Sequence, residues 1–400
     1  MAVQDHSLND SARRFDPASL IYDPKVRAIV FQIALIIGVV AFAWWIIGNT
    51  VENLRRANIA SGFGFLSARA GFDVSQSLIP YSSDSTYGRA FLVGLLNTLL
   101  VAAIGIVLAS IIGFLLGIAR LSKNWIIGRL ATVYVEVFRN VPVLLQLLFW
   151  YKAVLSVLPG PRQGVALAGG GNLSNRGLIL PRPIFEPGFG ASAIALVVAV
   201  VAAVVLANWA YRRRMATGQP FPTIRANLAI VIGLPLVVFF VTGAPLSIDY
   251  PELTGFNFVG GLHIQPEFLA LLLGLVLYTA AYIGEIVRAG ILAVAHGQTE
   301  ASYALGFRPG VTLRLVIIPQ ALRVIIPPLT NQYLNLTKNS SLAVAIGYPD
   351  LVSVFSGTVL NQTGQAVEVI LITMSVYLAI SLVTSGFMNW FNRRVALVER

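Results

Sequence analysis

The sequence predicts an all-α integral membrane protein that crosses the bilayer about eight times. Of its 400 residues, 56% are hydrophobic and only 11% are charged, whereas an average soluble domain is about 25% charged. The mean hydropathy is +0.78. Eight stretches provide the ~20 mostly apolar residues that a membrane-crossing helix needs. A soluble enzyme, a disordered chain and a nucleic-acid-binding module are therefore poor fits.

The eight candidate spans differ mainly in where they stop and in how polar they are. No cleavage site follows the first closely, so we expect it to be retained as a span. The third contains charges, and the seventh is unusually polar and is interrupted by Pro327 and Pro328. The approximate bounds are 28–48, 91–119, 131–158, 191–209, 228–246, 268–287, 324–346 and 367–390.

The distribution of basic residues predicts the orientation of the chain. Eight spans place both termini on one side, and a cytoplasmic assignment puts most of the 28 Lys and Arg residues in inner segments, as the positive-inside rule expects. The predicted units are an N-terminal cytoplasmic segment with the first span and an outer loop (1–88), a transmembrane domain (89–392) and a cytoplasmic tail (393–400). The transmembrane domain contains an inserted outer loop and helix pair at 159–266.

The residue types needed for chemistry are scarce. The chain has no Cys and only three widely separated His residues, so a thiolate or histidine metal site is not expected. The dipeptide Gly-Lys never occurs, which excludes the P-loop route to nucleotide binding. We therefore expect no metal or cofactor in this chain and no enzymatic activity of its own.

Span three carries polar residues within an apolar sequence. Drawn as one continuous helix, Glu136, Arg139, Asn140 and Gln146 share a face within an arc of about 120°. Pro142 removes a backbone hydrogen bond and is expected to kink the helix. One interpretation is a face lining a solute pathway. The alternative is an intrahelical pair between Glu136 and Arg139 near the headgroups.

Span six places Tyr278, Tyr282 and Glu285 on one stripe, with Arg288 one turn further on. Ionisable residues in a span usually face a cavity or a partner, which favours a pathway. The alternative is anchoring at the membrane interface, where aromatic and basic residues are common.

Span seven places Asn331, Asn335 and Lys338 at helical spacing on a second polar face. Such a face requires water or polar groups from another helix. The sequence leaves open whether it lines a solute pathway or forms hydrogen bonds with a partner helix.

A short helix is predicted over 298–305, in the inner loop between spans six and seven. Gly297 marks its start, Gly306 is placed to cap its C-terminus, and Pro309 cannot extend it. Small residues would let another surface approach closely; they are Ala301, Ser302 and Ala304. A rigid helix between two spans can serve as a lever for a soluble partner.

This loop resembles the E-A-A-x3-G-x9-I-x-L-P signature of ABC importer permeases. Four signature positions match, at Glu300, Ala301, Gly306 and Pro319. The departures keep a small or aliphatic residue and occur at Ser302, Val316 and Ile318.

Three further segments, 94–98, 138–146 and 280–290, are similar to the polar amino-acid permease branch, whose members include histidine and glutamate/glutamine importers. The resemblance covers about 89–158 and 267–392. The extra first span and the inserted fourth and fifth spans resemble the long permease subunits of general L-amino-acid transporters.

The resemblance implies a type I ABC importer transmembrane domain in a bacterial inner membrane, with lipid around it and no nucleic-acid partner. The chain would pair with a second permease subunit, a pair of ATPase subunits would bind ATP and Mg, and a periplasmic binding protein would deliver an L-amino acid. Coupling to the ATPase would be carried by Glu300, Ala301, Ser302 and Gly306. The substrate pathway would be lined by Glu136, Arg139, Asn140, Gln146, Glu285, Asn331, Asn335 and Lys338.

Two other functions remain open from the residues alone. An ion-coupled secondary amino-acid transporter would use Glu136, Glu285 and Lys338 as coupling groups and would need no ATP. A membrane scaffold or channel subunit would have no transport cycle and would not need polar stripes on three spans.

Overall fold

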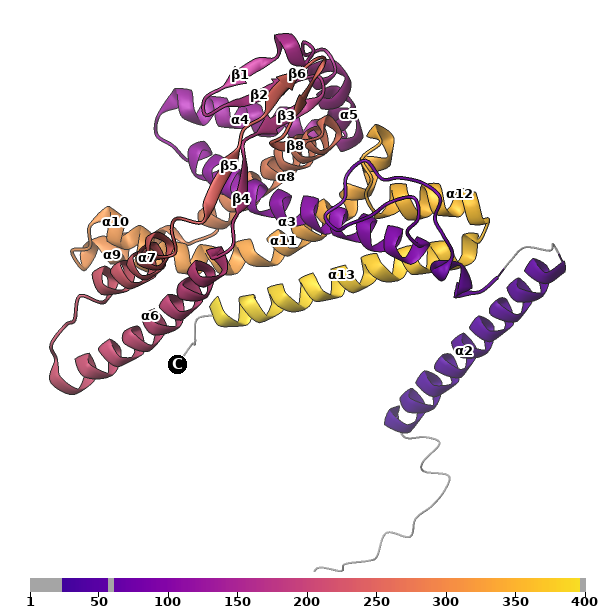
Figure 1. Ribbon diagram of the computed structural model, residues 1–400. Helices are drawn as coiled ribbons and strands as arrows, with labels where there is room; N and C mark the ends of the chain where they lie inside the picture. Colours follow the sequence, from indigo (N-terminus) through magenta and orange to yellow (C-terminus); the bar gives the residue numbers. More distant parts are fainter. Residues whose placement is uncertain (1–23, 57–60, 396–400) are drawn as a thin grey trace, which may run out of the picture.

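The computed structural model describes residues 24–56 and 61–395 of the chain (Figure 1). Within these residues, seven helices are long and apolar enough to cross a membrane, and one sharply bent pair would make an eighth. The beginning of the predicted N-terminal cytoplasmic segment (1–23) and the end of the predicted tail (396–400) lie outside the described residues.

The predicted order of apolar helices is confirmed. The long helices are α2 (Pro24–Arg56), α3 (Tyr87–Arg120), α4 (Trp125–Asn140) with α5 (Val143–Leu148), α6 (Phe189–Thr217), α7 (Thr223–Val241), α8 (Pro266–Leu292), α11 (Ile318–Asn339) and α13 (Ala366–Val395). Shorter helices are α9 (His296–Ala304), α10 (Pro309–Thr312) and α12 (Leu360–Thr363). The 3₁₀ segments are 63–67, 161–163 and 340–346, and the π-helical segments are 149–155, 313–317 and 352–359.

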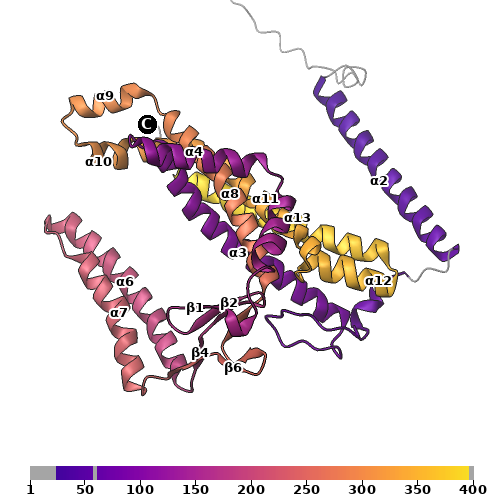
Figure 2. The same ribbon diagram turned by 90° about the horizontal axis from the view of Figure 1, so that it is seen from above.

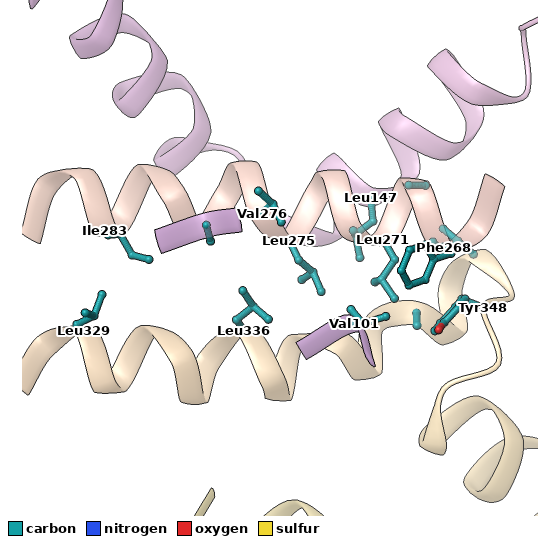
Figure 3. Packing of buried hydrophobic residues seen from close by; sticks show 14 of the residues in the cluster. Val101, Leu147, Phe268, Leu271, Leu275, Val276, Ile283, Leu329, Leu336 and Tyr348 are labelled. Carbon is teal, nitrogen blue, oxygen red and sulfur yellow. The ribbon is translucent and has the colours of Figure 1, made fainter. Parts of the chain in front are cut away.

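The core forms where α3, α8 and α11 pack together (Figure 3). Glycines allow α3 and α8 to approach closely. A Cβ added at Gly113 would lie 2.5 Å from the Cβ of Ile283, and one added at Gly117 would lie 2.6 Å from the Cβ of Val287. Small residues at such contacts are typical of membrane helix pairs, because lipid provides little hydrophobic drive for association. Close backbone packing therefore positions the two helices.

The start of α3 is tied to the segment that precedes α12. The Asn97 side-chain amide donates to the carbonyl of Pro349 at 2.9 Å, and the Thr98 hydroxyl accepts from the backbone N–H of Leu351 at 3.0 Å. A Cβ at Gly94 would lie 3.0 Å from the Cα of Leu351. The 94–98 segment, which sequence analysis related to amino-acid permeases, thus has a packing role.

The third predicted span is broken between α4 and α5, which meet at an angle of 105°. Pro142 lacks an N–H and cannot continue the hydrogen-bond ladder. The side-chain amide of Gln146 donates to the carbonyls of Phe138 and Val141, both at 2.9 Å. The prediction of a kink at Pro142 is confirmed. The prediction that Gln146 shares one helix face with the polar residues before Pro142 is wrong, because the break redirects the chain.

The seventh predicted span is longer than expected and is not interrupted. Helix α11 continues through Pro327 and Pro328, and the helical run to which it belongs extends over Pro309–Ile346. Prolines are tolerated in membrane helices because neighbouring groups and local adjustments satisfy the freed backbone atoms.

The insertion contains β-structure where the sequence predicted only loops. One antiparallel sheet has the order β1-β2-β3-β8, and two ribbons pair β4 with β5 and β6 with β7. The strands are β1 (Val165–Leu167), β2 (Gly171–Ser174), β3 (Gly177–Leu180), β4 (Arg182–Phe185), β5 (Leu246–Asp249), β6 (Glu252–Thr254), β7 (Asn257–Val259) and β8 (Leu262–Ile264). The sheet therefore pairs strands from the beginning of the insertion with the strand at its end, which immediately precedes α8 in the sequence.

Helices α6 and α7 pack against each other and stand beside the core, and α2 also lies apart (Figure 2). Both views place α9, the connection from α6 to α7 and the C-terminal end of α13 at the same end of the molecule. The strands lie away from that end.

Candidate coupling helix and polar helix faces

Helix α9 lies in the predicted loop and has the predicted cap at Gly306. Its bounds are His296–Ala304, so it begins two residues before and ends one residue before the predicted 298–305, and Gly297 lies inside the helix. Its last turn is closed by two hydrogen bonds, from Gly306 N–H to the Tyr303 carbonyl at 2.9 Å and from Phe307 N–H to the Ser302 carbonyl at 3.1 Å. Gly306 has a φ of +77°, a conformation that residues with a Cβ adopt at a cost. The closure fixes the angle at which the chain leaves α9.

Helix α9 has an exposed side and a buried side. Glu300 and Ala301 are exposed, whereas Ser302 is buried and donates its hydroxyl hydrogen to the Gln298 carbonyl at 2.7 Å. The Glu300 carboxylate lies 3.0 Å from Nδ1 of His296, which is also exposed. Among the predicted coupling residues, Glu300 and Ala301 are thus accessible to a partner, whereas Ser302 is buried and bonded within α9.

Helix α9 is mechanically linked to two spans. It follows α8 after three residues and packs against α10 and the π-helical segment that leads into α11. The Gln320 amide of α11 donates to the Gln298 side-chain oxygen at 3.2 Å. A force applied to α9 would therefore reach both α8 and α11.

A charge network joins α3, α4 and α8 near the end of α8 that leads to α9. Glu285 forms salt bridges with Arg120 and with Arg288, the second at 2.6 Å. Arg120 also lies 3.7 Å from the Glu136 carboxylate. The side chain of Arg120 is only 10% exposed, so removing a carboxylate would leave a poorly solvated cation. The alternative of a Glu136–Arg139 pair is wrong, because the salt-bridge partner of Glu136 is Arg120.

Sequence analysis did not select Arg120 as a site residue. Because Arg120 is the last residue of α3, the sequence analysis interpreted it as a basic residue that marks the end of an apolar span. The signal available in the sequence was the presence of acidic residues in two other spans, which need cationic partners inside a membrane.

Arg139 belongs to an aromatic seam between α4 and α8. Its Cζ lies 5.3 Å from the centre of the Tyr282 ring, within the range of a cation–π interaction. The Tyr278 and Tyr282 hydroxyls are 3.2 Å apart, and the Tyr134 hydroxyl donates to the Leu277 carbonyl at 2.9 Å. Asn140 is exposed and donates to the carbonyl of Glu136, one turn earlier in α4, at 2.7 Å.

The polar face of α11 is left without a partner inside the described part of the chain. Asn331, Asn335 and Lys338 are exposed, and their side chains make no hydrogen bond or salt bridge with residues 24–56 or 61–395. Three amide or ammonium groups on an apolar helix need water or another polypeptide. Within the described residues, no hydrogen bond or salt bridge links this face to the Glu285 network or to buried Gln146.

No group of three His, Asp or Glu side chains able to hold a metal ion occurs within the described residues. An apolar cavity of about 400 Å³ lies at the α4–α5 bend, beside Phe138 and Gln146. A larger cavity of about 520 Å³, with a mixed polar and apolar lining, lies where the inserted sheet meets the start of α8.

Comparison with known proteins identifies the family. Residues 105–397 match the model of the "Binding-protein-dependent transport system inner membrane component" family. The general L-amino acid transport system permease protein AapQ of Rhizobium johnstonii is 59% identical over 382 residues, covering 96% of this chain and 95% of that protein. The putative amino-acid ABC transporter permease protein YhdX of Escherichia coli K12 is 56% identical, covering 94% and 96%.

Two further similarities are more distant. The glutamate/glutamine/aspartate/asparagine transport system permease protein BztB of Rhodobacter capsulatus is 42% identical, covering 96% of this chain and 97% of that protein. The crystal structure of an amino acid ABC transporter with histidines aligns with a TM-score of 0.46 and 22% identity, covering 77% of this chain and 95% of that chain. The family match over 105–397 and the relatives at 59% and 56% identity confirm the resemblance inferred from residues 300–319, and the chain belongs to the family of binding-protein-dependent transport system inner membrane components.

Proposed function

We propose that the chain is the permease subunit of an ATP-driven importer of L-amino acids in a bacterial inner membrane. A periplasmic binding protein would deliver the solute. A separate pair of ATPase subunits, which bind ATP and Mg, would act on α9, and a second permease subunit would complete the path. The observation that carries this proposal is α9 itself: a capped, exposed helix fixed between two spans. The long relatives at 59% and 56% identity are amino-acid permeases, which supports the solute class.

On this proposal α9, the α6–α7 connection and both chain termini face the cytoplasm. The basic residues Arg212, Arg213 and Arg214 stand near the end of α6, at the same end of the molecule as α9. This arrangement agrees with the positive-inside rule. The strands of the insertion would then face the periplasm.

The polar faces of α4, α8 and α11 are proposed to replace water around the solute. A zwitterion loses hydration on entering a membrane and needs polar groups in compensation. The exposed amides and ammonium of Asn331, Asn335 and Lys338 are suited to this role, while Glu285 and Glu136 form salt bridges with Arg120. The ion-coupled alternative is not favoured, because it gives α9 no role. The matching family is that of binding-protein-dependent transport systems, and the relative YhdX is named a putative ABC transporter permease protein.

Uptake by the reconstituted complex is expected to require both ATP and the binding protein. The chain would be co-purified with its partners, placed in proteoliposomes, and assayed for uptake of L-glutamine. Withholding either ATP or the binding protein should abolish uptake, whereas a protonophore or sodium removal should leave it unchanged. Uptake by the purified chain alone, driven by an ion gradient, would refute the proposal.

Cysteine labelling should show whether the α11 face meets solute or the partner permease. The chain has no Cys, so single Asn335→Cys and Lys338→Cys variants give one thiol each. A pathway predicts modification by a membrane-impermeant cationic methanethiosulfonate in the assembled complex, with slowing by L-glutamine. Leu378→Cys, on the exposed face of α13, is the unreactive control. Labelling that occurs only after the partner permease is removed would assign the face to the subunit interface.

A further inference from the structure

A pocket of about 520 Å³ with a mixed polar and apolar lining opens between the inserted sheet and the helical core. Its lining comes from five parts of the chain and includes Ser75, Tyr151, Asn175, Arg176, Glu267 and Gly347. Its volume lies in the range of small-molecule sites, which are typically about 300–1,000 Å³. In contrast, the cavity beside Gln146 has an almost wholly apolar lining and cannot solvate a charged ligand.

The acidic side of the pocket is held in place by a tyrosine. Glu267 is half-buried in the first turn of α8, and the Tyr151 hydroxyl donates to its Oε1 at 2.8 Å. The other carboxylate oxygen has no hydrogen-bond partner in the described chain. Tyr151 belongs to the π-helical segment 149–155, and such segments are frequent at functional sites. Glu267 thus presents one free, oriented oxygen.

The basic side of the pocket comes from the tip of the β2–β3 hairpin. Asn175 and Arg176 form its two-residue turn, and the Asn175 N–H donates to the Pro159 carbonyl at 3.0 Å. Gly177 follows with a φ of +103° and sits so close to the backbone at 264–266 that a Cβ would clash. The turn is therefore fixed, yet the Arg176 guanidinium has no acidic partner within residues 24–56 or 61–395.

We infer that this pocket is a vestibule subsite for the zwitterionic backbone of an amino acid, binding its α-carboxylate at Arg176 and its α-ammonium at Glu267. The inference rests on the proposed function, which gives the solute and places the insertion outside the membrane. The guanidinium fork matches a carboxylate in two parallel hydrogen bonds. The two charges line one cavity without pairing with each other, which suits a ligand that carries both.

The subsite gives the insertion a function in capture. Arg176 belongs to the inserted segment, whereas Tyr151 and Glu267 belong to the helical core. A solute released at the periplasmic face would be held at the mouth of the path without any contact to its side chain. Recognition limited to the backbone groups would suit a permease that accepts several amino acids.

Two charge-removing variants test the subsite. Arg176→Gln removes the carboxylate site, and Glu267→Gln removes the ammonium site while keeping an acceptor for Tyr151. The matched controls are Arg182→Gln and Glu186→Gln, which change exposed residues of the same insertion outside the pocket. Each assembled complex would be placed in nanodiscs without the binding protein, and L-glutamine binding would be titrated by saturation-transfer NMR. The same complexes in proteoliposomes, with saturating binding protein, would give uptake per ATP hydrolysed.

Either pocket variant should weaken L-glutamine binding about tenfold, as expected for one lost charge-assisted hydrogen bond, and should lower uptake per ATP. The controls should match wild type in both assays.

If Arg176→Gln also matches wild type while wild type retains ATP-dependent uptake, the subsite is refuted and the proposed function stands. If the NMR titration is unchanged but more binding protein is needed for half-maximal ATPase activity, Arg176 contacts the binding protein and the subsite is again refuted. Uptake by wild type that does not depend on ATP would refute the proposed function instead. The NMR titration would still show whether the pocket variants bind L-glutamine more weakly than wild type.

Discussion

Replacing Gly113 by alanine should destabilise the helical core, although alanine is the better helix former. The added Cβ would lie 2.5 Å from the Cβ of Ile283 and 3.0 Å from the carbonyl oxygen of Ala280. The first neighbour is not the end of a flexible side chain, so α3 and α8 would have to separate. Overpacking of this kind costs about 1–3 kcal/mol, more than the roughly 1 kcal/mol that a Gly→Ala change gains in an exposed helix.

The matched control is Gly386→Ala in α13, where a new Cβ meets no atom within 4 Å. Both variants gain the same helix propensity, so their difference isolates the α3–α8 contact. Thermal unfolding of the purified complex, followed by size-exclusion chromatography after heating, should show a lower midpoint for Gly113→Ala and an equal or higher one for Gly386→Ala. Equal midpoints for the two variants would contradict the close packing.

The features that sequence analysis predicted well have local causes. The spans follow from continuous apolar runs, and the end of α9 follows from one glycine that tolerates a positive φ at Gly306. The break near Pro142 follows from a missing N–H. In each case the residues that determine the structure are neighbours in the chain.

The features that sequence analysis missed depend on distant residues. Strand β3 pairs with β8, although the α6–α7 hairpin separates the two strands in the sequence. The strands are only three or four residues long, too short for an alternation of apolar and polar residues to identify them. Gln146 leaves the polar face of α4 because the bend is as large as 105°. Predicting that a bend occurs at Pro142 does not predict its angle. The Arg120–Glu285 contact joins residues that are 165 positions apart. No local pattern specifies such pairings.

Removing the carboxylate of Glu300 is expected to uncouple the permease from its ATPase without unfolding it. Glu300 is exposed, and its contact within the described chain is with the exposed His296 at 3.0 Å. Exposed ion pairs contribute only about 0–1 kcal/mol to stability, so Glu300→Ala should unfold at nearly the wild-type temperature. If α9 is the ATPase docking helix, the same variant should lose at least about tenfold in ATP-dependent uptake, which corresponds to about 1.4 kcal/mol at the interface.

Three measurements separate coupling from other effects of the Glu300 change. Thermal unfolding reports the fold, co-purification reports ATPase binding, and binding-protein-stimulated ATP hydrolysis together with uptake reports coupling. His296→Ala removes the same intrahelical contact while keeping the carboxylate, so it should retain most of its uptake. Glu252→Ala, an exposed carboxylate on β6, should behave like wild type. Glu300→Ala with intact stimulated hydrolysis and intact uptake would contradict the role of α9, because the exposed face that the helix presents would then have no functional contact.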